Sequence, residues 1–258
     1  MIFMNNEIIE NINSVKRRIA IAAAGCGRDP DCVKLMAVTK TVAPERILQA
    51  VDAGITLLGE NYVQEAKEKI AFIKDRLVEE NSTSPDACPA HAGSVFQQPQ
   101  WHMIGHLQAN KAKYAVNLFD CIHSVDRLEL AAELNKRAGL IPRKMSILIE
   151  INVSGEKTKN GVAVAAAMDL VKKISALENL AVHGLMTMAP YSDNPESSRP
   201  YFRALRCLRN DIKRAGIAGV SMDELSMGMT DDFAVAVEEG ATIIRVGRAI
   251  FGARPDKQ

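Results

Sequence analysis

The chain lacks the features that mark membrane, secreted and nucleic-acid-binding proteins. No apolar stretch approaches the roughly 20 residues of a membrane helix, and the N-terminus lacks the basic-then-apolar order of a secretory signal. The 32 basic and 31 acidic residues give a formal net charge of +1, so no overall field attracts nucleic acid or an anionic membrane surface. We therefore expect a cytoplasmic protein with no nucleic-acid or membrane partner, in which any anion site is local.

Cysteine and histidine are also scarce. The five cysteines are an odd number without a Cys-x-x-Cys pair, which argues against both a disulfide framework and a zinc site and predicts free thiols. His102 and His106 stand four residues apart, but Gly105 and the surrounding pattern favour a strand ending in a turn, which separates their directions. We predict no metal site.

Short apolar runs alternating with longer segments of helical period dominate what the sequence does contain. An opening helix is expected over about residues 4–24, and the alternation after it is typical of repeated βα units. A chain of 258 residues with 47% hydrophobic content can bury a full core. The expected strands are Lys34–Thr39, Ile55–Gly59, Gln100–Gly105, Cys121–Ser124, Met145–Val153, Val182–Met188, Glu224–Met227 and Thr242–Val246.

Eight strands, each followed by a helix, predict a (β/α)₈ TIM barrel with an extra N-terminal helix. A doubly wound open sheet would show the same local pattern but would concentrate unusual residues at one switch point. Here they follow every strand, as in Thr39–Lys40 and Asn152–Ser154. Because barrel enzymes keep their sites at that face, we favour an α/β class barrel spanning residues 1–258 as a single domain.

Residues 81–99 interrupt the alternation. This stretch is rich in Pro, Ser and Ala and has no sustained apolar period. We predict a surface insertion before the third strand, without a catalytic role.

Lys40 ends the first predicted strand, at the mouth of the expected barrel. Partial desolvation and nearby cations would lower its pKa there and expose the free amine that attacks an aldehyde. The alternative is a solvated lysine that caps a strand.

The loops after the seventh and eighth strands predict a phosphate site. Loops at these positions of a barrel commonly bind phosphate through backbone N–H groups. Here they contain Ser226 and Gly228, then Gly247 and Gly252. Glycine lets amides approach an anion closely, and a serine hydroxyl can donate directly. The alternative is that these glycines serve only tight turns.

Arg245 lies at the end of the eighth strand, where burial without an anionic partner is unfavourable. One interpretation is a salt bridge inside the mouth, with Glu60 as a candidate partner. The other is donation to a cofactor's pyridine nitrogen, which keeps that nitrogen unprotonated and weakens the ring as an electron sink.

Six motifs, in order along nearly the whole chain, resemble the pyridoxal-phosphate homeostasis protein family. Only residues 81–99 depart clearly from the compact family pattern. The motifs are Ala-Val-Thr-Lys (37–40), Gly-Glu-Asn-Tyr-Val-Gln-Glu (59–65), Trp-His-Met-Ile-Gly-His-Leu-Gln-Ala-Asn-Lys (101–111), His-Gly-Leu-Met-Thr-Met (183–188), Leu-Ser-Met-Gly-Met-Thr (225–230) and Ile-Arg-Val-Gly-Arg-Ala-Ile-Phe-Gly (244–252).

The resemblance implies a fold-type III barrel that holds pyridoxal 5′-phosphate (PLP) as an aldimine on Lys40. It places Arg245 at the pyridine nitrogen and Asn61 and Tyr62 at the border of the cofactor. The phosphate contacts that it implies come from Ser226, Met227, Gly228, Gly247 and Arg248.

The resemblance further implies a protein that buffers or delivers PLP, with apo PLP-dependent enzymes as recipients and without efficient catalysis. Alanine racemases share the barrel but add a second domain that supplies a catalytic tyrosine. No such domain follows Gly252 in this sequence, so two-base racemisation is expected to lack a partner. The alternatives are an amino-acid racemase or lyase that uses Lys40, and a barrel that serves only as an interaction scaffold.

Overall fold

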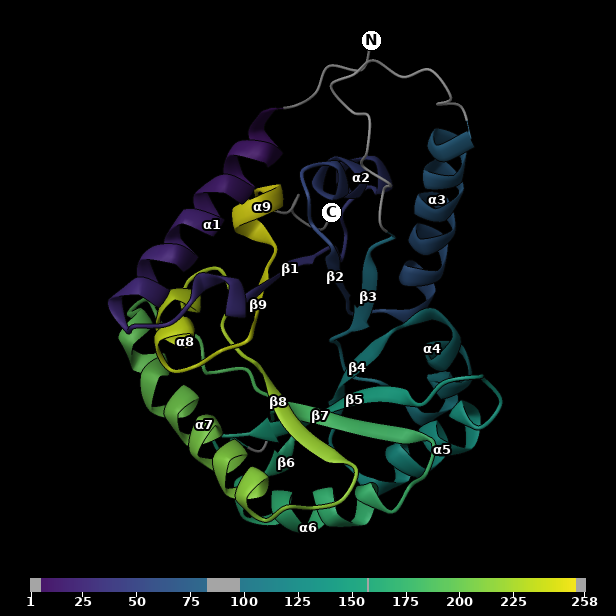
Figure 1. Cartoon of the computed structure of the whole chain (residues 1–258), viewed down its shortest axis with the longest axis vertical. Helices are drawn as coiled ribbons and strands as arrows, with labels where there is room; N and C mark the ends of the chain where they lie inside the picture. Colours follow the sequence, from purple (N-terminus) through teal and green to yellow (C-terminus); the bar gives the residue numbers. More distant parts are fainter. Residues whose placement is uncertain (1–5, 83–97, 157, 254–258) are drawn as a thin grey trace.

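The computed structural model describes residues 6–82, 98–156 and 158–253 (Figure 1). The opening helix α1 spans Asn6–Gly25, which confirms the predicted helix. It packs beside the last two described helices, α8 (Phe233–Glu238) and α9 (Arg248–Phe251). Most of the predicted 81–99 insertion lies outside the described residues, so its role stays a prediction. No described helix is long and apolar enough to cross a membrane.

Eight parallel strands close into a barrel, because β4 pairs with both β3 and β5. This closure confirms the predicted (β/α)₈ fold and makes the open-sheet alternative wrong. A short additional strand, β6 (Val162–Ala163), pairs with the end of β5 and was not predicted. The barrel strands are β1 (Lys34–Val38), β2 (Leu57–Glu60), β3 (Gln100–Met103), β4 (Cys121–Val125), β5 (Met145–Asn152), β7 (Leu180–Met186), β8 (Val220–Ser226) and β9 (Ile243–Val246).

Helices surround the barrel in the order that the alternating pattern predicts. Pro44 occupies the first turn of α2, where its missing N–H leaves no donor unsatisfied. Asp232 precedes α8, and its carboxylate accepts a hydrogen bond from the Met229 amide at 2.6 Å. The remaining elements of the described residues are α2 (Pro44–Asp52), α3 (Val63–Ser82), α4 (Ala112–Leu118), α5 (Leu128–Ala138), α6 (Val164–Ser175), α7 (Arg199–Arg214) and the 3₁₀ turns η1 (Pro30–Cys32), η2 (Ala109–Lys111) and η3 (Pro195–Ser198).

Side chains of each strand alternate between the helix layer and the barrel interior. Outward residues such as Ala37 and Ile244 join one large apolar core beneath the helices. Inward residues form separate small clusters, one containing Met36 and Ile243 and another containing Cys121, Leu148 and Met186. Alternate residues of a strand therefore point into the interior, and the residues between them point toward the helices.

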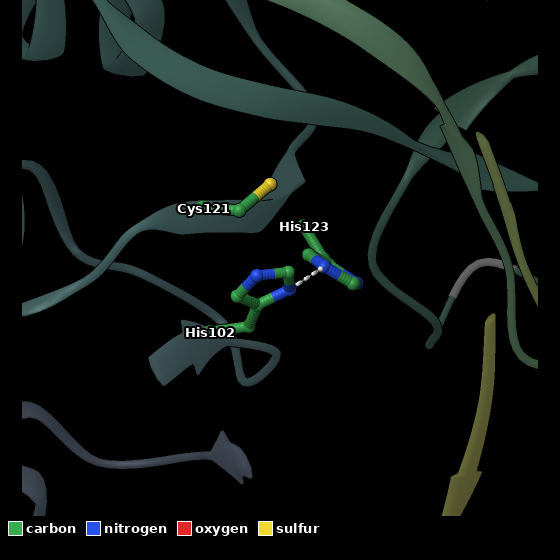
Figure 2. Close-up of side chains that lie close together, drawn as sticks. All are labelled: His102, Cys121 and His123. Atoms are coloured by element: carbon green, nitrogen blue, oxygen red, sulfur yellow. Dashed lines mark hydrogen bonds between the residues drawn. The ribbon is translucent and has the colours of Figure 1, made fainter. Parts of the chain in front are cut away.

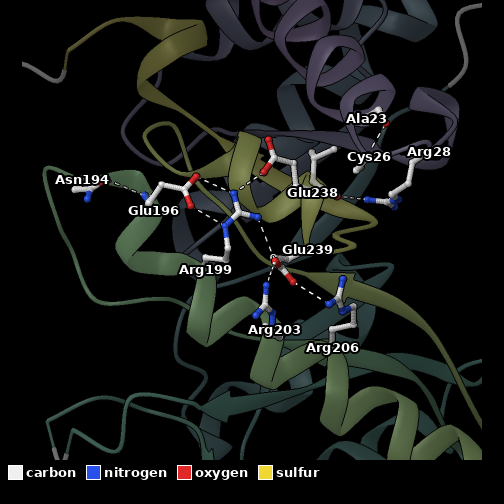
Figure 3. Close-up of polar contacts among 11 residues, drawn as sticks. Ala23, Cys26, Arg28, Asn194, Glu196, Arg199, Arg203, Arg206, Glu238 and Glu239 are labelled. Carbon is white, nitrogen blue, oxygen red and sulfur yellow. Dashed lines mark hydrogen bonds and ion pairs between the residues drawn. The ribbon is translucent and has the colours of Figure 1, made fainter.

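A group of ion pairs joins α7 to the end of α8 (Figure 3). Arg199 pairs with Glu238 at 2.6 Å and with Glu239 at 3.2 Å. Arg203 and Arg206 reach the same Glu239 carboxylate, whose side chain is only 4% exposed. Since α8 follows the β8 loop, these pairs help to fix the position of that loop.

Candidate functional site

The polar residues of the barrel mouth come from segments that follow β1, β2, β8 and β9. Ala37 is the register partner of Val246, and Val38 is the partner of Gly59. Because all these strands run parallel, Lys40 lies between the loop that starts at Gly247 and the segment that follows β2. The structure thus brings the predicted lysine next to one of the predicted phosphate loops.

Lys40 is half-buried and lies two residues past the end of β1. Met36 faces the barrel interior, and strand alternation places Val38 and Lys40 on the same side. The next residue, Thr41, has a φ of 63°, in the left-handed region that β-branched residues rarely adopt. Such a conformation persists only where neighbouring contacts hold it.

A buried ammonium group fixes the peptide before Lys40. Lys69 of α3 donates to the Thr39 carbonyl at 2.6 Å and to Glu60 Oε1 at 2.8 Å. The Thr39 hydroxyl also donates to Glu60 Oε1, at 2.6 Å. These three side chains are buried and lie between the barrel and α3.

The peptide after Lys40 is fixed by a second carboxylate of the same group. The Thr41 amide donates to Glu65 Oε1 at 2.5 Å, and Lys69 pairs with that oxygen at 2.6 Å. One lysine and two glutamates therefore hold the backbone on both sides of Lys40. We call Glu60, Glu65 and Lys69 the Lys69 triad.

The triad also shows that a salt bridge between Arg245 and Glu60 is wrong. Glu60 faces outward from β2 and bonds to Lys69, whereas Arg245 faces inward from β9. Burial raises the pKa of the Glu60 carboxyl even though Lys69 and Thr39 favour its charged form.

Arg245 lies inside the barrel and is only 4% exposed. Its guanidinium donates to Ser226 Oγ at 2.7 Å and to the Thr187 carbonyl at 2.8 Å. Burial lowers the pKa of Arg245 to about 10, although the carboxylates of Asp232 and Glu150 favour the cation. The guanidinium is therefore still charged at neutral pH and is oriented by two neutral acceptors.

The two glycine loops are shaped for close approach. Gly228 has a φ of 90°, and a Cβ built on it would stand 2.5 Å from the Ala236 Cβ. Gly247 precedes α9, and a Cβ there would stand 3.3 Å from the Val38 carbonyl oxygen. Within residues 6–82, 98–156 and 158–253, the amides of Gly228, Gly247 and Arg248 donate to no protein acceptor. These amides are available to an anion.

The other predicted contacts differ in what they can offer. Asn61 is half-buried, and its Oδ1 has no partner among the described residues. Tyr62 is 60% exposed. The Met227 side chain lies in the outer core, and its amide already donates to the Ile243 carbonyl. The Arg248 side chain is exposed and pairs with Asp231 at 2.7 Å, so only its amide is oriented for a ligand.

A buried histidine pair beneath the mouth was not predicted (Figure 2). His102 of β3 is the register partner of Cys121 of β4, and His123 stands two residues further along β4. His102 Nδ1 and His123 Nε2 lie 2.9 Å apart, and His123 Nδ1 lies 3.0 Å from Ser226 Oγ. Burial lowers the pKa of His102 to about 3 and that of His123 well below its usual value, so both rings are neutral.

The same cluster has the residue types of a metal site. One ligand atom from each of His102, Cys121 and His123 lies within 4.8 Å of the others. However, the two imidazoles satisfy each other through a hydrogen bond, which explains their approach without an ion. The predicted absence of a metal site stays a prediction.

Glu150 is the second functional candidate that the sequence did not reveal. It shares the inward parity of Leu148 on β5 and is 3% exposed. Burial, together with the charge of Asp126, raises the pKa of its carboxyl to about 7, against the opposing effect of Arg245. The signal in the sequence was one acidic residue inside an apolar run, Ile-Leu-Ile-Glu-Ile.

Comparison with known proteins places this geometry in a family. The model of the alanine racemase N-terminal domain matches residues 10–255. A pyridoxal phosphate homeostasis protein of Aquifex aeolicus is 42% identical over 245 residues, which cover 95% of this chain and 97% of the relative. The homologue of the same name from Escherichia coli strain K12 is 35% identical over 96% of this chain and 97% of its own length.

Solved structures agree with this assignment. PipY of Synechococcus elongatus, solved with PLP bound, superposes with a TM-score of 0.76 at 31% identity, covering 95% of this chain and all of PipY. An alanine racemase of Clostridium difficile shares the fold at 12% identity, with a TM-score of 0.66, and is matched over 58% of its length. The chain belongs to the pyridoxal phosphate homeostasis protein family, built on the alanine racemase N-terminal barrel.

Proposed function

We propose that this protein binds PLP at the barrel mouth through Lys40 and buffers or delivers it inside the cell, without efficient amino-acid chemistry of its own. The observation that carries the proposal is the arrangement of three groups around one mouth. Lys40 has both flanking peptides fixed, the amides of Gly228 and Gly247 have no protein acceptor in the described chain, and Arg245 is buried and charged.

The loops after β8 and β9 fit the phosphate of this cofactor. Amides without a protein acceptor can donate to phosphate oxygens, and Gly228 leaves no room for a side chain that would block their approach. Barrel proteins commonly bind phosphate at this position. The amide of Arg248, in the first turn of α9, adds a further donor.

Lys40 and Arg245 fit the two other functional groups of the cofactor, its aldehyde and its pyridine nitrogen. When bound, PLP supplies an aldehyde that condenses with a lysine amine to form a Schiff base. The Lys69 triad would keep the backbone of Lys40 in one position relative to that aldehyde. The unpaired Asn61 Oδ1 is a buried polar atom at the same mouth, of the kind that a ligand satisfies.

Arg245 also supports a carrier over a racemase or lyase. A guanidinium that is charged at neutral pH and lies at the pyridine nitrogen would keep that nitrogen unprotonated, so the ring would be a weak electron sink for a carbanion. The relatives named pyridoxal phosphate homeostasis proteins cover nearly the whole chain, whereas the racemases share only the fold.

The test is transfer of PLP from the loaded protein to an apo PLP-dependent enzyme, with and without a trap for free cofactor. We expect the recipient to regain activity, and the loaded protein itself to turn over alanine, serine and glutamate only at trace rates. Lys67, an exposed lysine of α3, provides the matched control, Lys67→Ala against Lys40→Ala. Turnover in the ordinary enzyme range of roughly 1–1000 per second, lost in Lys40→Ala, would contradict the carrier.

A further inference from the structure

Four side chains form a continuous polar chain through the barrel interior. Arg245 contacts Ser226 Oγ at 2.7 Å, and Ser226 Oγ contacts His123 Nδ1 at 3.0 Å. His123 Nε2 then contacts His102 Nδ1 at 2.9 Å. All four residues are buried, and they come from β9, β8, β4 and β3. Figure 2 shows the end of this chain, where His123 bonds His102 close to Cys121.

Counting protons gives this chain a direction. Arginine has no acceptor atom, so Ser226 Oγ accepts from Arg245. Among the described residues, the other contact of the Ser226 hydroxyl is His123 Nδ1. If His123 carried its proton on Nδ1, the serine proton would be buried without an acceptor, which is unfavourable. Both shared protons have an acceptor if Ser226 donates to His123 Nδ1 and His123 Nε2–H donates to His102 Nδ1. The remaining proton then lies on His102 Nε2, at the end of the chain, in a residue that is 8% exposed and not fully buried.

The opposite arrangement is the one in which Ser226 would serve the phosphate. His123 would then donate from Nδ1 to the serine oxygen, and the serine proton would need an acceptor in the ligand. The two arrangements differ in the tautomer of His123, which can be measured. They also differ in which end of the cofactor Ser226 acts on.

We propose that His123 is a positioning residue for Arg245: it accepts the Ser226 proton, which directs the serine oxygen at the guanidinium and fixes the group that faces the ring end of the cofactor. His102 keeps His123 in the required tautomer. Hydrogen bonds that run in one direction polarise one another, so the serine oxygen becomes a stronger acceptor for Arg245. Ser226 thereby acts on the ring end and not on the phosphate.

This inference rests on the proposed function only for the identity of the ligand. Its first test compares PLP with pyridoxal, which has the same ring and aldehyde but no phosphate. Dissociation constants are measured for the wild type, Ser226→Ala, His123→Leu and the double variant. Ser221→Ala is the matched control, because Ser221 bonds a different histidine, His183, away from Arg245.

We expect Ser226→Ala to weaken both ligands by the same factor, about tenfold or more, since the bond that it removes has a charged donor. His123→Leu should also weaken both ligands by about tenfold, because it removes the acceptor that directs the serine oxygen at the guanidinium. The double variant should bind no more weakly than the weaker single variant, and Ser221→Ala should bind like the wild type. A loss for PLP without a loss for pyridoxal, or losses that multiply in the double variant, would overturn the proposal.

His123→Asn keeps the test decisive if His123→Leu fails to fold. An asparagine oxygen near the position of Nδ1 can still accept from Ser226, so we expect affinity within about twofold of the wild type. A loss as large as that of Ser226→Ala would contradict the role of the Nδ1 acceptor.

The second test needs no ligand. Nitrogen-15 NMR of the histidine side chains should show His123 protonated on Nε2 and unprotonated on Nδ1 in the cofactor-free protein. A proton on Nδ1 would overturn the proposed direction. If the wild type bound neither PLP nor pyridoxal, the proposed function would fail. The tautomer of His123 would still test the direction of the hydrogen bonds between Arg245 and His102.

Discussion

The Thr41 amide donates a hydrogen bond of 2.5 Å to Glu65 Oε1, and this bond holds the residue after Lys40 in the left-handed region. Glu65 lies on α3, the helix that follows β2, whereas Lys40 follows β1. The position of the lysine at the mouth thus depends on a contact from α3.

Replacing the cation of the Lys69 triad should destabilise the fold. Lys69→Met leaves Glu60 and Glu65 without their ammonium partner, and the Glu60 side chain is fully buried. Removing one partner of a buried ion pair typically costs about 3–5 kcal/mol. Urea denaturation measures the free energy of unfolding, with Lys67→Met as the exposed control. A loss of less than about 1 kcal/mol would show that the triad does not hold this segment.

Gly228→Ala should destabilise the protein by more than the strain of its left-handed backbone alone. The new Cβ would stand 2.5 Å from Ala236 Cβ and 3.0 Å from Phe233 Cα. Gly54→Ala is the matched control, because Gly54 has a similar φ of 85° with nothing within 4 Å of a Cβ. The control should lose about 1–2 kcal/mol of stability from the backbone alone. We expect Gly228→Ala to lose more stability than the control and also to retain PLP poorly, as measured by equilibrium dialysis. Equal losses of stability in the two variants would show that the close contacts with Ala236 and Phe233 cost nothing.

The buried carboxyl of Glu150 predicts a dependence of stability on pH. Its pKa rises from 4.5 to about 7 on folding, so the folded state holds this proton more tightly than the unfolded state. Glu150 therefore destabilises the folded protein increasingly as pH rises from about 4.5 to 7. Glu150→Gln should therefore gain stability over the wild type across that range, up to on the order of 3 kcal/mol above pH 7.

The difference in unfolding free energy between Glu150→Gln and the wild type cancels the contribution of the two buried histidines, which both proteins share. Their lowered pKa values act in the opposite sense, since their contribution to stability is lost as pH falls below about 6.5. Urea denaturation of the cofactor-free proteins between pH 5 and pH 8 supplies the comparison. A difference that stays constant with pH would mean that Glu150 titrates normally.

Lys40→Ala should abolish covalent attachment of PLP but leave weaker, noncovalent binding. The amides of Gly228 and Gly247 do not depend on the lysine side chain, so the anion site should persist. The absorption spectrum reports attachment, and equilibrium dialysis reports total binding. Complete loss of binding would contradict an independent phosphate site.

The sequence predicts the barrel well because each strand carries a short apolar run between polar turns. Its errors have local causes. The start of β8 at Val220 was missed because Ser221 and Asp223 interrupt the apolar pattern. The two-residue strand β6 is too short to leave a pattern.

The site was only partly predictable, because its contacts depend on register and on helix packing. Lys40 and Arg245 stood out because the sequence places them at or next to the ends of predicted strands. The pairing of His102 with Cys121 depends on the register of β3 against β4, which spacing along the chain does not encode. The bond between Glu60 and Lys69 likewise requires α3 to pack on β2.

The central claim is that Lys40 is the residue that holds PLP. Incubating the protein with PLP, reducing it with borohydride and mapping the modified peptides by mass spectrometry tests this claim directly. We expect one dominant pyridoxyl adduct on Lys40, absent in Lys40→Ala and retained in Lys67→Ala. No adduct, or a dominant adduct on another lysine of the wild-type protein, would contradict the account.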